Sequence, residues 1–345
     1  MAVKARPDTT ALQQLKKQLK ENALGNLYVF HGEEAYLRDH YLGQMKKRLL
    51  PAGMEDFNYH VINEKEFDLK KLAQFIDCLP MMSQRTMVVV NDHDLFKGDK
   101  EGLTALLKEL PEYVCLVFVY DLIAYKADAR TKLAGVLKEK GCVVAFNRQE
   151  QGDLVDWIAR RFKALDHDIG TEEAKYLIFK CGDLMHTLIS EISKVGAYAS
   201  HRRVTRQDID AVATPQLDAV VFDMTDAIAA GNFDKAASVL GDLYHMQERP
   251  INLLAILGKQ LRQLYTARLA LEQKKGSRYL VELWKMRSAY PAERLMQSAR
   301  RFSLGWCRRA VIRCAQVDLA MKSTGADGEE LLTGLLMELA VKKGA

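Results

Sequence analysis

Short apolar runs alternate with amphipathic segments over the first 146 residues of the chain. The runs are rich in β-branched and aromatic residues, a composition typical of buried strands. We therefore expect strands within residues 27–30, 58–62, 86–90, 114–120 and 142–146. Between them, apolar residues recur at helical spacing; one face of residues 68–79 would carry Leu69, Leu72, Phe75, Ile76 and Leu79. This alternation predicts an α/β domain over residues 1–146, with a parallel five-stranded sheet and helices on both faces.

The composition changes after Phe146, where the polar segment NRQEQGD begins. Every later element has the periodicity of a helix. Residues 147–213 contain four such segments, and a second break at ATPQLDAV leads into a longer helical region over residues 214–345. We therefore predict three domains, one α/β and two all-α, which suits a chain of 345 residues.

Local signals place several helix ends in these two regions. Thr205 and Asp208 have the spacing of a capping box, and Ser303 is placed to cap the helix that follows it. In that helix the carboxylate of Asp318 falls on the apolar stripe. Lys322, four residues later, is expected to pair with it.

Composition and charge narrow the class of protein. With 48% hydrophobic and 28% charged residues the chain is globular. The net charge of +5 permits contact with nucleic acid or an acidic protein, but is below that of a dedicated DNA-binding domain. The six cysteines lie mostly in apolar runs without a C-x-x-C pair, which favours buried, reduced thiols. With no signal peptide or membrane span expected, the sequence indicates a soluble cytoplasmic protein without a membrane partner.

The first strand is followed by Gly32 and a helix-like pattern, the outline of a phosphate-binding loop. Such a loop needs a second glycine followed by Lys-Ser or Lys-Thr to hold phosphate and magnesium. Here Glu33 and Glu34 follow the glycine instead. We expect both carboxylates to satisfy the positive end of the helix dipole and to repel an anion. No nucleotide-binding residues are therefore predicted.

Asp92 and Asp94 follow the third apolar run, as a magnesium-binding acid would, but no glutamate comes next to orient a water. With the phosphate loop missing, we interpret both residues as turn formers after a buried strand. The histidines are scattered and pair with no nearby cysteine. The sequence thus predicts no catalytic residues, no metal site and no cofactor.

The segment CLPMMSQRTMVVV, from Cys78 to Val90, is the most informative stretch. Pro80 requires the preceding helix to end near Leu79, which places Met81 and Met82 in a turn before the next strand. Two interpretations remain open. With Leu79 the methionines form an exposed apolar plug for a partner's pocket, or they fold inward and cover the edge of the sheet.

Basic residues collect in the last third of the chain, including Arg300, Arg301, Arg308 and Arg309. They predict either a patch that faces DNA or another subunit, or ordinary solvated helix faces.

Four stretches, in this order, resemble the delta subunit of the bacterial DNA polymerase III clamp loader. They are LYVFHGEEAYLRD from Leu27, LPMMSQRTMVVVND from Leu79, the long run VFDMTDAIAAGNFDKAASVLGDLYHMQERPINLLAILGKQLRQL from Val221, and VDLAMKSTG from Val317. The resemblance covers nearly the whole chain. The Ser-Arg-Cys motif and the four-cysteine zinc site of the related ATPase and delta-prime subunits are missing.

The resemblance implies an AAA+-like domain over residues 1–146 without a functional phosphate loop, a helical lid over 147–213 and a helical collar over 214–345. The implied partners are the β sliding clamp, the gamma/tau and delta-prime subunits of a hetero-pentamer, and primed DNA within the complex. In that family an apolar tip before the third strand binds the clamp and lets it open for loading. Leu79, Met81 and Met82 match the tip, although other members often have phenylalanine or leucine where this chain has methionine.

The resemblance also implies a subunit without catalysis of its own, working within a DNA-directed DNA polymerase, a nucleotidyltransferase holoenzyme. Four alternatives are weighed against it, among them an interaction module in an unrelated assembly. A second is an active AAA+ ATPase with an unusual phosphate loop, and a third is a DNA-binding protein that uses the C-terminal arginines. The fourth is a different clamp-loader or replication subunit that binds nucleotide or DNA directly.

Overall fold

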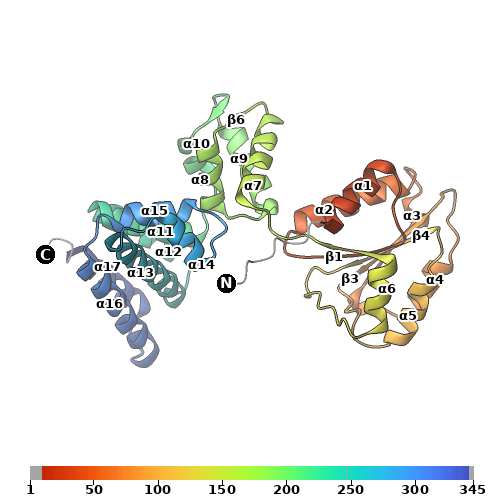
Figure 1. Cartoon of the computed structure of the whole chain (residues 1–345). Helices are drawn as coiled ribbons and strands as arrows, with labels where there is room; N and C mark the ends of the chain where they lie inside the picture. Colours follow the sequence, from red (N-terminus) through yellow and green to blue (C-terminus); the bar gives the residue numbers. More distant parts are fainter. Residues whose placement is uncertain (1–9, 246, 342–345) are drawn as a thin grey trace. The chain divides into compact units, whose positions relative to one another are not determined.

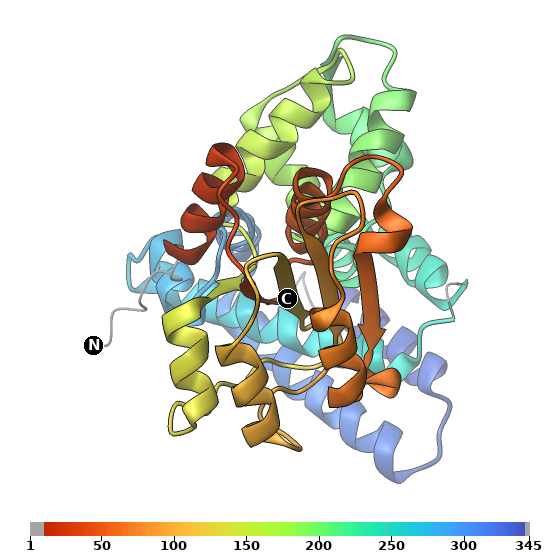
Figure 2. The same ribbon diagram turned by 90° about the vertical axis from the view of Figure 1, so that its right-hand side faces the viewer.

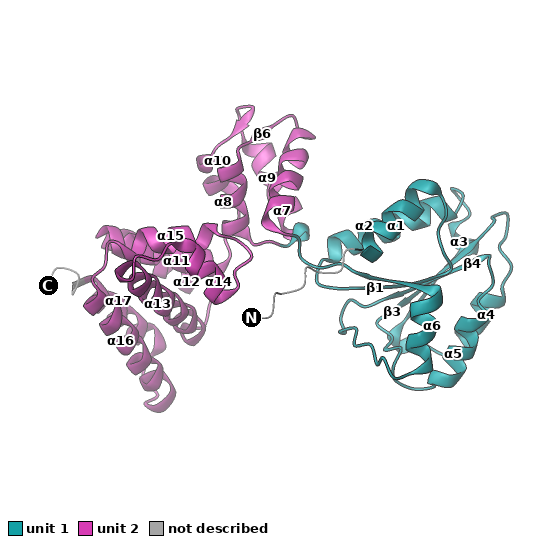
Figure 3. Ribbon diagram, viewed as in Figure 1, with its two compact units in different colours: residues 1–149, 184–186 teal, residues 150–183, 187–345 magenta. Residues whose placement is uncertain are grey.

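The computed structural model describes residues 10–245 and 247–341 (Figure 1). The chain forms two compact units (Figure 3). The first unit comprises residues 1–149 and 184–186, and the second comprises residues 150–183 and 187–345. Apart from residues 147–149 and 184–186, both predicted all-α regions fall within the second unit, so the boundary between residues 147–213 and 214–345 stays a prediction.

The first unit contains the predicted parallel sheet. Its strands run in the order β2-β3-β4-β1-β5, and every neighbouring pair is parallel. Each predicted apolar run corresponds to one strand, which confirms the predicted sheet: β1 (Leu27–His31), β2 (Tyr59–Asn63), β3 (Thr86–Asn91), β4 (Val114–Val119) and β5 (Gly141–Ala145).

Helices cover both faces of this sheet, as the alternating pattern predicted (Figure 2). Side chains that alternate along a strand point to opposite faces. Tyr28 and Phe30 therefore pack with α1 (Thr10–Glu21) and α2 (Ala35–Leu49). Leu27 and Val29 belong to the core under the other helices, which are α4 (Leu69–Asp77), α5 (Lys100–Lys108) and α6 (Lys132–Lys140). Two short helices, α3 (Glu55–Asn58) and η1 (Glu64–Glu66), flank β2.

The two aspartates after β3 organise the adjoining loops. Asp92 is buried, and its Oδ1 accepts hydrogen bonds from the backbone N–H groups of Asp121 at 2.8 Å and Leu122 at 2.7 Å. Asp94 accepts one from the N–H of Phe96 at 3.1 Å. Both carboxylates are thus engaged by backbone, as expected of turn-forming residues.

The second unit is mostly helical. Its helices are α7 (Gln151–Lys163), α8 (Thr171–Cys181), α9 (Met185–Tyr198), α10 (Arg206–Val212), α11 (Leu217–Ala230), α12 (Phe233–His245), α13 (Pro250–Glu272), α14 (Ser277–Trp284), α15 (Tyr290–Ala299), α16 (Leu304–Ser323) and α17 (Gly328–Val341). The expectation that every later element is a helix was wrong in one respect. The two-residue strands β6 (Asp168–Ile169) and β7 (Arg203–Val204) pair in parallel, and segments this short carry no periodicity to detect.

The predicted local signals of the second unit are confirmed. Thr205 and Asp208 form the capping box of α10, and the Ser303 side chain accepts from the N–H of Trp306 at the start of α16. Lys322 Nζ lies 2.7 Å from Asp318 Oδ2.

Two further expectations concerned buried, reduced cysteines and membrane-spanning segments. All cysteines are free thiols, and five are buried as expected, whereas Cys78 beside the tip segment is exposed. Within residues 10–245 and 247–341, no helix combines the length and the apolar character needed to cross a membrane.

Candidate functional site

The loop between β1 and α2 is closed by protein backbone. Gly32 has φ +117°, a conformation that side chains strongly disfavour, and a Cβ at this position would overlap the carbonyl oxygen of Phe146. The backbone of Phe146 is held there by two hydrogen bonds. Its N–H donates to the His31 carbonyl at 2.6 Å, and its carbonyl accepts from the Glu34 N–H at 2.9 Å. In a phosphate loop the ligand lies close to the backbone of this glycine. Here the backbone of Phe146 lies there instead.

The two glutamates of this loop have protein partners. Glu33 Oε2 lies 2.6 Å from Arg148 Nε, and the buried Glu34 accepts a hydrogen bond from the N–H of Met185, another residue of the first unit, at 3.4 Å. Glu34 occupies the N-cap position of α2, but its side chain makes no cap hydrogen bond. Glu34 therefore lies at the positive end of the helix dipole without capping the helix by a hydrogen bond. The expectation that both carboxylates satisfy the dipole stays a prediction.

The predicted tip is exposed on the first unit. α4 ends at Asp77, two residues earlier than expected, so Leu79 has left the apolar face of the helix. Leu79 is 77% exposed, Met81 54% and Met82 78%. Of the two interpretations, inward folding of the methionines is therefore wrong. The three side chains form an apolar tip between α4 and β3.

Asn58 fixes the backbone of this tip. Its buried side-chain amide donates from Nδ2 to the carbonyl of Met81 at 2.9 Å, and its Oδ1 accepts from the N–H of the same residue at 2.8 Å. Nδ2 also donates to the carbonyl of Met54 at 2.9 Å. The sequence analysis did not identify Asn58, because it lies 23 residues from its partner and belongs to no local motif.

The segment after the tip is anchored as firmly. Met82 adopts a left-handed φ of +50°, which turns the chain toward β3. Arg85, at the end of the turn, donates from its guanidinium to the carbonyls of Leu24 at 2.6 Å, Gly25 at 2.8 Å and Val114 at 3.1 Å. Asn58 and Arg85 therefore hold both ends of a short segment whose apolar side chains remain in solvent.

The four C-terminal arginines lie around the junction of α15 and α16. Arg300 and Arg301 follow the last residue of α15, and Arg308 and Arg309 lie on α16. All four are exposed, and none has an ion-pair partner within the part of the chain that the structure describes. All four side chains are thus open to solvent, and both the patch and its contact with DNA or a subunit stay predictions.

The fold and these sites define a protein with a parallel α/β unit and a mostly helical unit, in which the loop after β1 is closed by the chain's own backbone. The sequence model of the family 'DNA polymerase III, delta subunit' matches residues 28–147 of the chain. The family model 'DNA polymerase III delta subunit, C-terminal domain' matches residues 218–339. The chain belongs to the DNA polymerase III delta subunit family.

Individual relatives agree with this assignment. The chain is 24% identical to DNA polymerase III subunit delta of Bacillus subtilis (strain 168) over 331 residues, which cover 94% of this chain and 95% of the relative. It is 25% identical over 282 residues to the probable DNA polymerase III subunit delta of Aquifex aeolicus (strain VF5), covering 77% of each chain. The solved structure of the Bacillus subtilis DNA clamp loader delta protein shares the fold, with a TM-score of 0.55, 22% identity and coverage of 95% and 99%.

Replacing Gly32 by alanine tests the closed loop. We expect Gly32→Ala to lower the free energy of unfolding by at least about 2 kcal/mol, because the methyl group meets backbone and the φ angle is disfavoured. Gly135→Ala is the control, since Gly135 is helical and has open space around it; that change should be neutral or stabilising by up to about 1 kcal/mol. Urea denaturation followed by circular dichroism measures both, and equal behaviour of the two variants would contradict the close packing at Gly32.

Nucleotide binding gives a second check on the same loop. Because carboxylates and the Phe146 backbone occupy it, a fluorescent ATP analogue titrated against the isolated protein should show no saturable change in anisotropy. Saturable binding with a dissociation constant of about 1–10 μM would favour the ATPase alternative instead.

Proposed function

We propose that this chain works as the clamp-binding subunit of its clamp loader, with Leu79, Met81 and Met82 inserted into the β sliding clamp. The observation that carries the proposal is an apolar tip whose three side chains are each more than half exposed while its backbone is fixed. Burial of each such side chain is worth about 1.5–3 kcal/mol. Because Asn58 and Arg85 already hold the backbone, little conformational entropy is lost on binding.

Clamp opening follows if the tip binds the open ring better than the closed one. A ligand shifts a conformational equilibrium only by the difference between its affinities for the two states. Three apolar contacts therefore bias the ring toward its open form without hydrolysis by this chain. Nucleotide hydrolysis is assigned in this proposal to the gamma/tau subunits, while this subunit binds the clamp.

Assembly with the gamma/tau and delta-prime subunits is assigned to the second unit. Exposed apolar side chains on two adjacent helices support this, namely Ile312 and Leu319 on α16 and Met337 on α17. Exposed leucine, isoleucine and methionine on packed helices are suited to a helical interface. Within the assembled complex, the patch of Arg300, Arg301, Arg308 and Arg309 is proposed to face primed DNA or a neighbouring subunit.

Charge placed in the tip should abolish clamp binding. The double variant Met81→Asp, Met82→Asp is expected to raise the dissociation constant for the clamp by at least about 100-fold, because two desolvated carboxylates replace apolar contacts. Its thermal midpoint should stay unchanged, since both side chains are exposed. Leu122→Asp is the matched control, because Leu122 is 87% exposed on the same unit outside the tip. Biolayer interferometry with immobilised clamp measures all three proteins, and retained binding by the double variant would remove the tip from the mechanism.

Asn58 should matter through the position of the tip. We expect Asn58→Ala to weaken clamp binding about 10-fold, because the loss of the paired hydrogen bonds to Met81 lets the segment move. A purely structural role would lower the thermal midpoint but leave the affinity of the folded protein intact. Asn63→Ala is the control: Asn63 is an exposed amide at the end of β2 whose side chain contacts Asn91 rather than the tip.

A further inference from the structure

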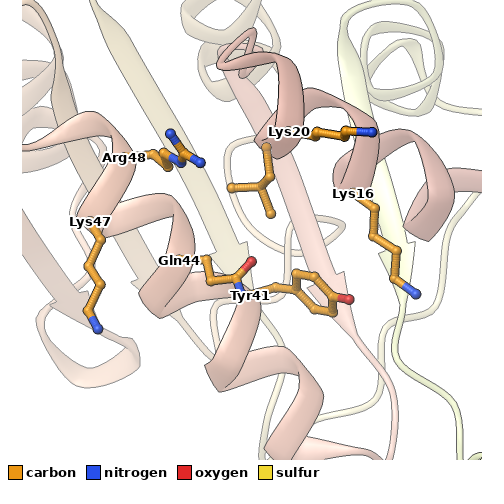
Figure 4. Close-up of a pocket in the computed structure, with 7 residues that line it drawn as sticks. Lys16, Lys20, Tyr41, Gln44, Lys47 and Arg48 are labelled. Carbon is orange, nitrogen blue, oxygen red and sulfur yellow. The ribbon is translucent and has the colours of Figure 1, made fainter.

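A hollow of about 620 Å³ opens between α1 and α2 on the first unit (Figure 4). Its rim carries four cationic side chains, and its remaining lining is one aliphatic residue, one aromatic ring and one amide. These residues are Lys16, Leu19, Lys20, Tyr41, Gln44, Lys47 and Arg48. Neither the closed phosphate loop nor the apolar tip contributes to it.

Positive charge is concentrated on these two helices. Together they contain seven Lys or Arg residues against two Asp or Glu residues. Both acids face other cations of the same helices: Glu21 lies 3.9 Å from Lys17, and Asp39 lies 3.4 Å from Arg38. The four cations around the hollow are exposed and have no ion-pair partner among the described residues. Their charge is therefore available to a ligand.

The hollow is formed before any ligand arrives. Leu19 is 6% exposed and belongs to the core beneath the helices. The Tyr41 ring stacks on Phe146 with a centroid distance of 5.9 Å. α1 is tied to the sheet by a hydrogen bond of 2.9 Å from the hydroxyl of Tyr28 to Gln18. A preorganised site loses little entropy on binding.

The chemistry of the lining favours a phosphate-bearing polymer. Three of the four cations are lysines and one is arginine. Both side chains bind phosphate oxygens, lysine as a point charge and arginine through its planar fork. The partly exposed ring of Tyr41 offers an aromatic surface to a base, and the exposed Gln44 offers an amide to a base or sugar. A hollow of this volume accepts a small molecule the size of a nucleotide.

We propose that this hollow binds the backbone of single-stranded nucleic acid, with Lys16, Lys20, Lys47 and Arg48 on the phosphates. This site is separate from the arginines at the junction of α15 and α16, which belong to the second unit. It is also independent of the proposed clamp contact, and the two proposals can fail separately.

The test is fluorescence anisotropy of the full-length protein with a labelled oligothymidylate of about 20 nucleotides at several salt concentrations. The variant Lys16→Gln, Lys20→Gln, Lys47→Gln, Arg48→Gln should weaken binding at low salt by at least about 10-fold. The plot of log K against log salt concentration should also become less steep, by about 3 in slope. This is the change expected when four phosphate contacts on a single strand, and the counterions that they release, are lost.

The matched control removes the same charges elsewhere on the first unit. Lys126→Gln, Arg130→Gln, Lys132→Gln, Lys138→Gln also replaces three lysines and one arginine, all exposed. It should change affinity by less than about 2-fold. The Met81→Asp, Met82→Asp variant should bind the oligonucleotide normally even though it loses the clamp.

Three results would overturn the proposal. One is an equal loss of affinity in the two quadruple variants, which would indicate non-specific charge. Another is wild-type binding by the first quadruple variant at an unchanged thermal midpoint. The third is competition by polyglutamate as effective as that by unlabelled oligonucleotide at equal charge, which would assign the hollow to an acidic protein surface.

Discussion

The position of the apolar tip depends on a pair of hydrogen bonds between the amide of Asn58 and the backbone of Met81. The amide pairs with both the N–H and the carbonyl group of Met81, a residue that has no partner strand. The loop is therefore held by the same kind of hydrogen bonds as a strand. Because the backbone of Met81 is satisfied inward, its side chain and that of Met82 are left outward. An apolar surface that would otherwise collapse onto the sheet is thereby kept in water, where a partner can reach it.

The closed loop after β1 explains how the nucleotide scaffold persists without a nucleotide. In a working phosphate loop the bound anion satisfies the backbone N–H groups at the start of the helix. Here the Phe146 carbonyl accepts a hydrogen bond from the N–H of Glu34, and the carboxylate of Glu33 forms an ion pair with Arg148. Groups of the chain itself therefore lie at the start of α2, where a phosphate loop would hold its ligand.

Much of this could be predicted from the sequence, and the limits have physical causes. The inner strands β1, β3 and β4 were predictable because each is a continuous apolar run buried on both faces. The exposed tip was one of two interpretations because Pro80 ends the helix. Asn58 was not predictable, since a buried amide is meaningful only once its distant partner is known. The hollow between α1 and α2 was missed for the same reason, because two unremarkable basic helices create it only when the sheet brings them together.

The apolar tip and the basic hollow would bind their partners through different interactions. The two binding activities can therefore be distinguished by experiment. Apolar burial is insensitive to moderate salt, whereas phosphate contacts release counterions and weaken steeply as salt rises. Under the two proposals, one α/β unit keeps its hold on a protein ring while its contact with nucleic acid is made and broken. The same difference means that salt alone can resolve the two surfaces experimentally, without any change in the chain.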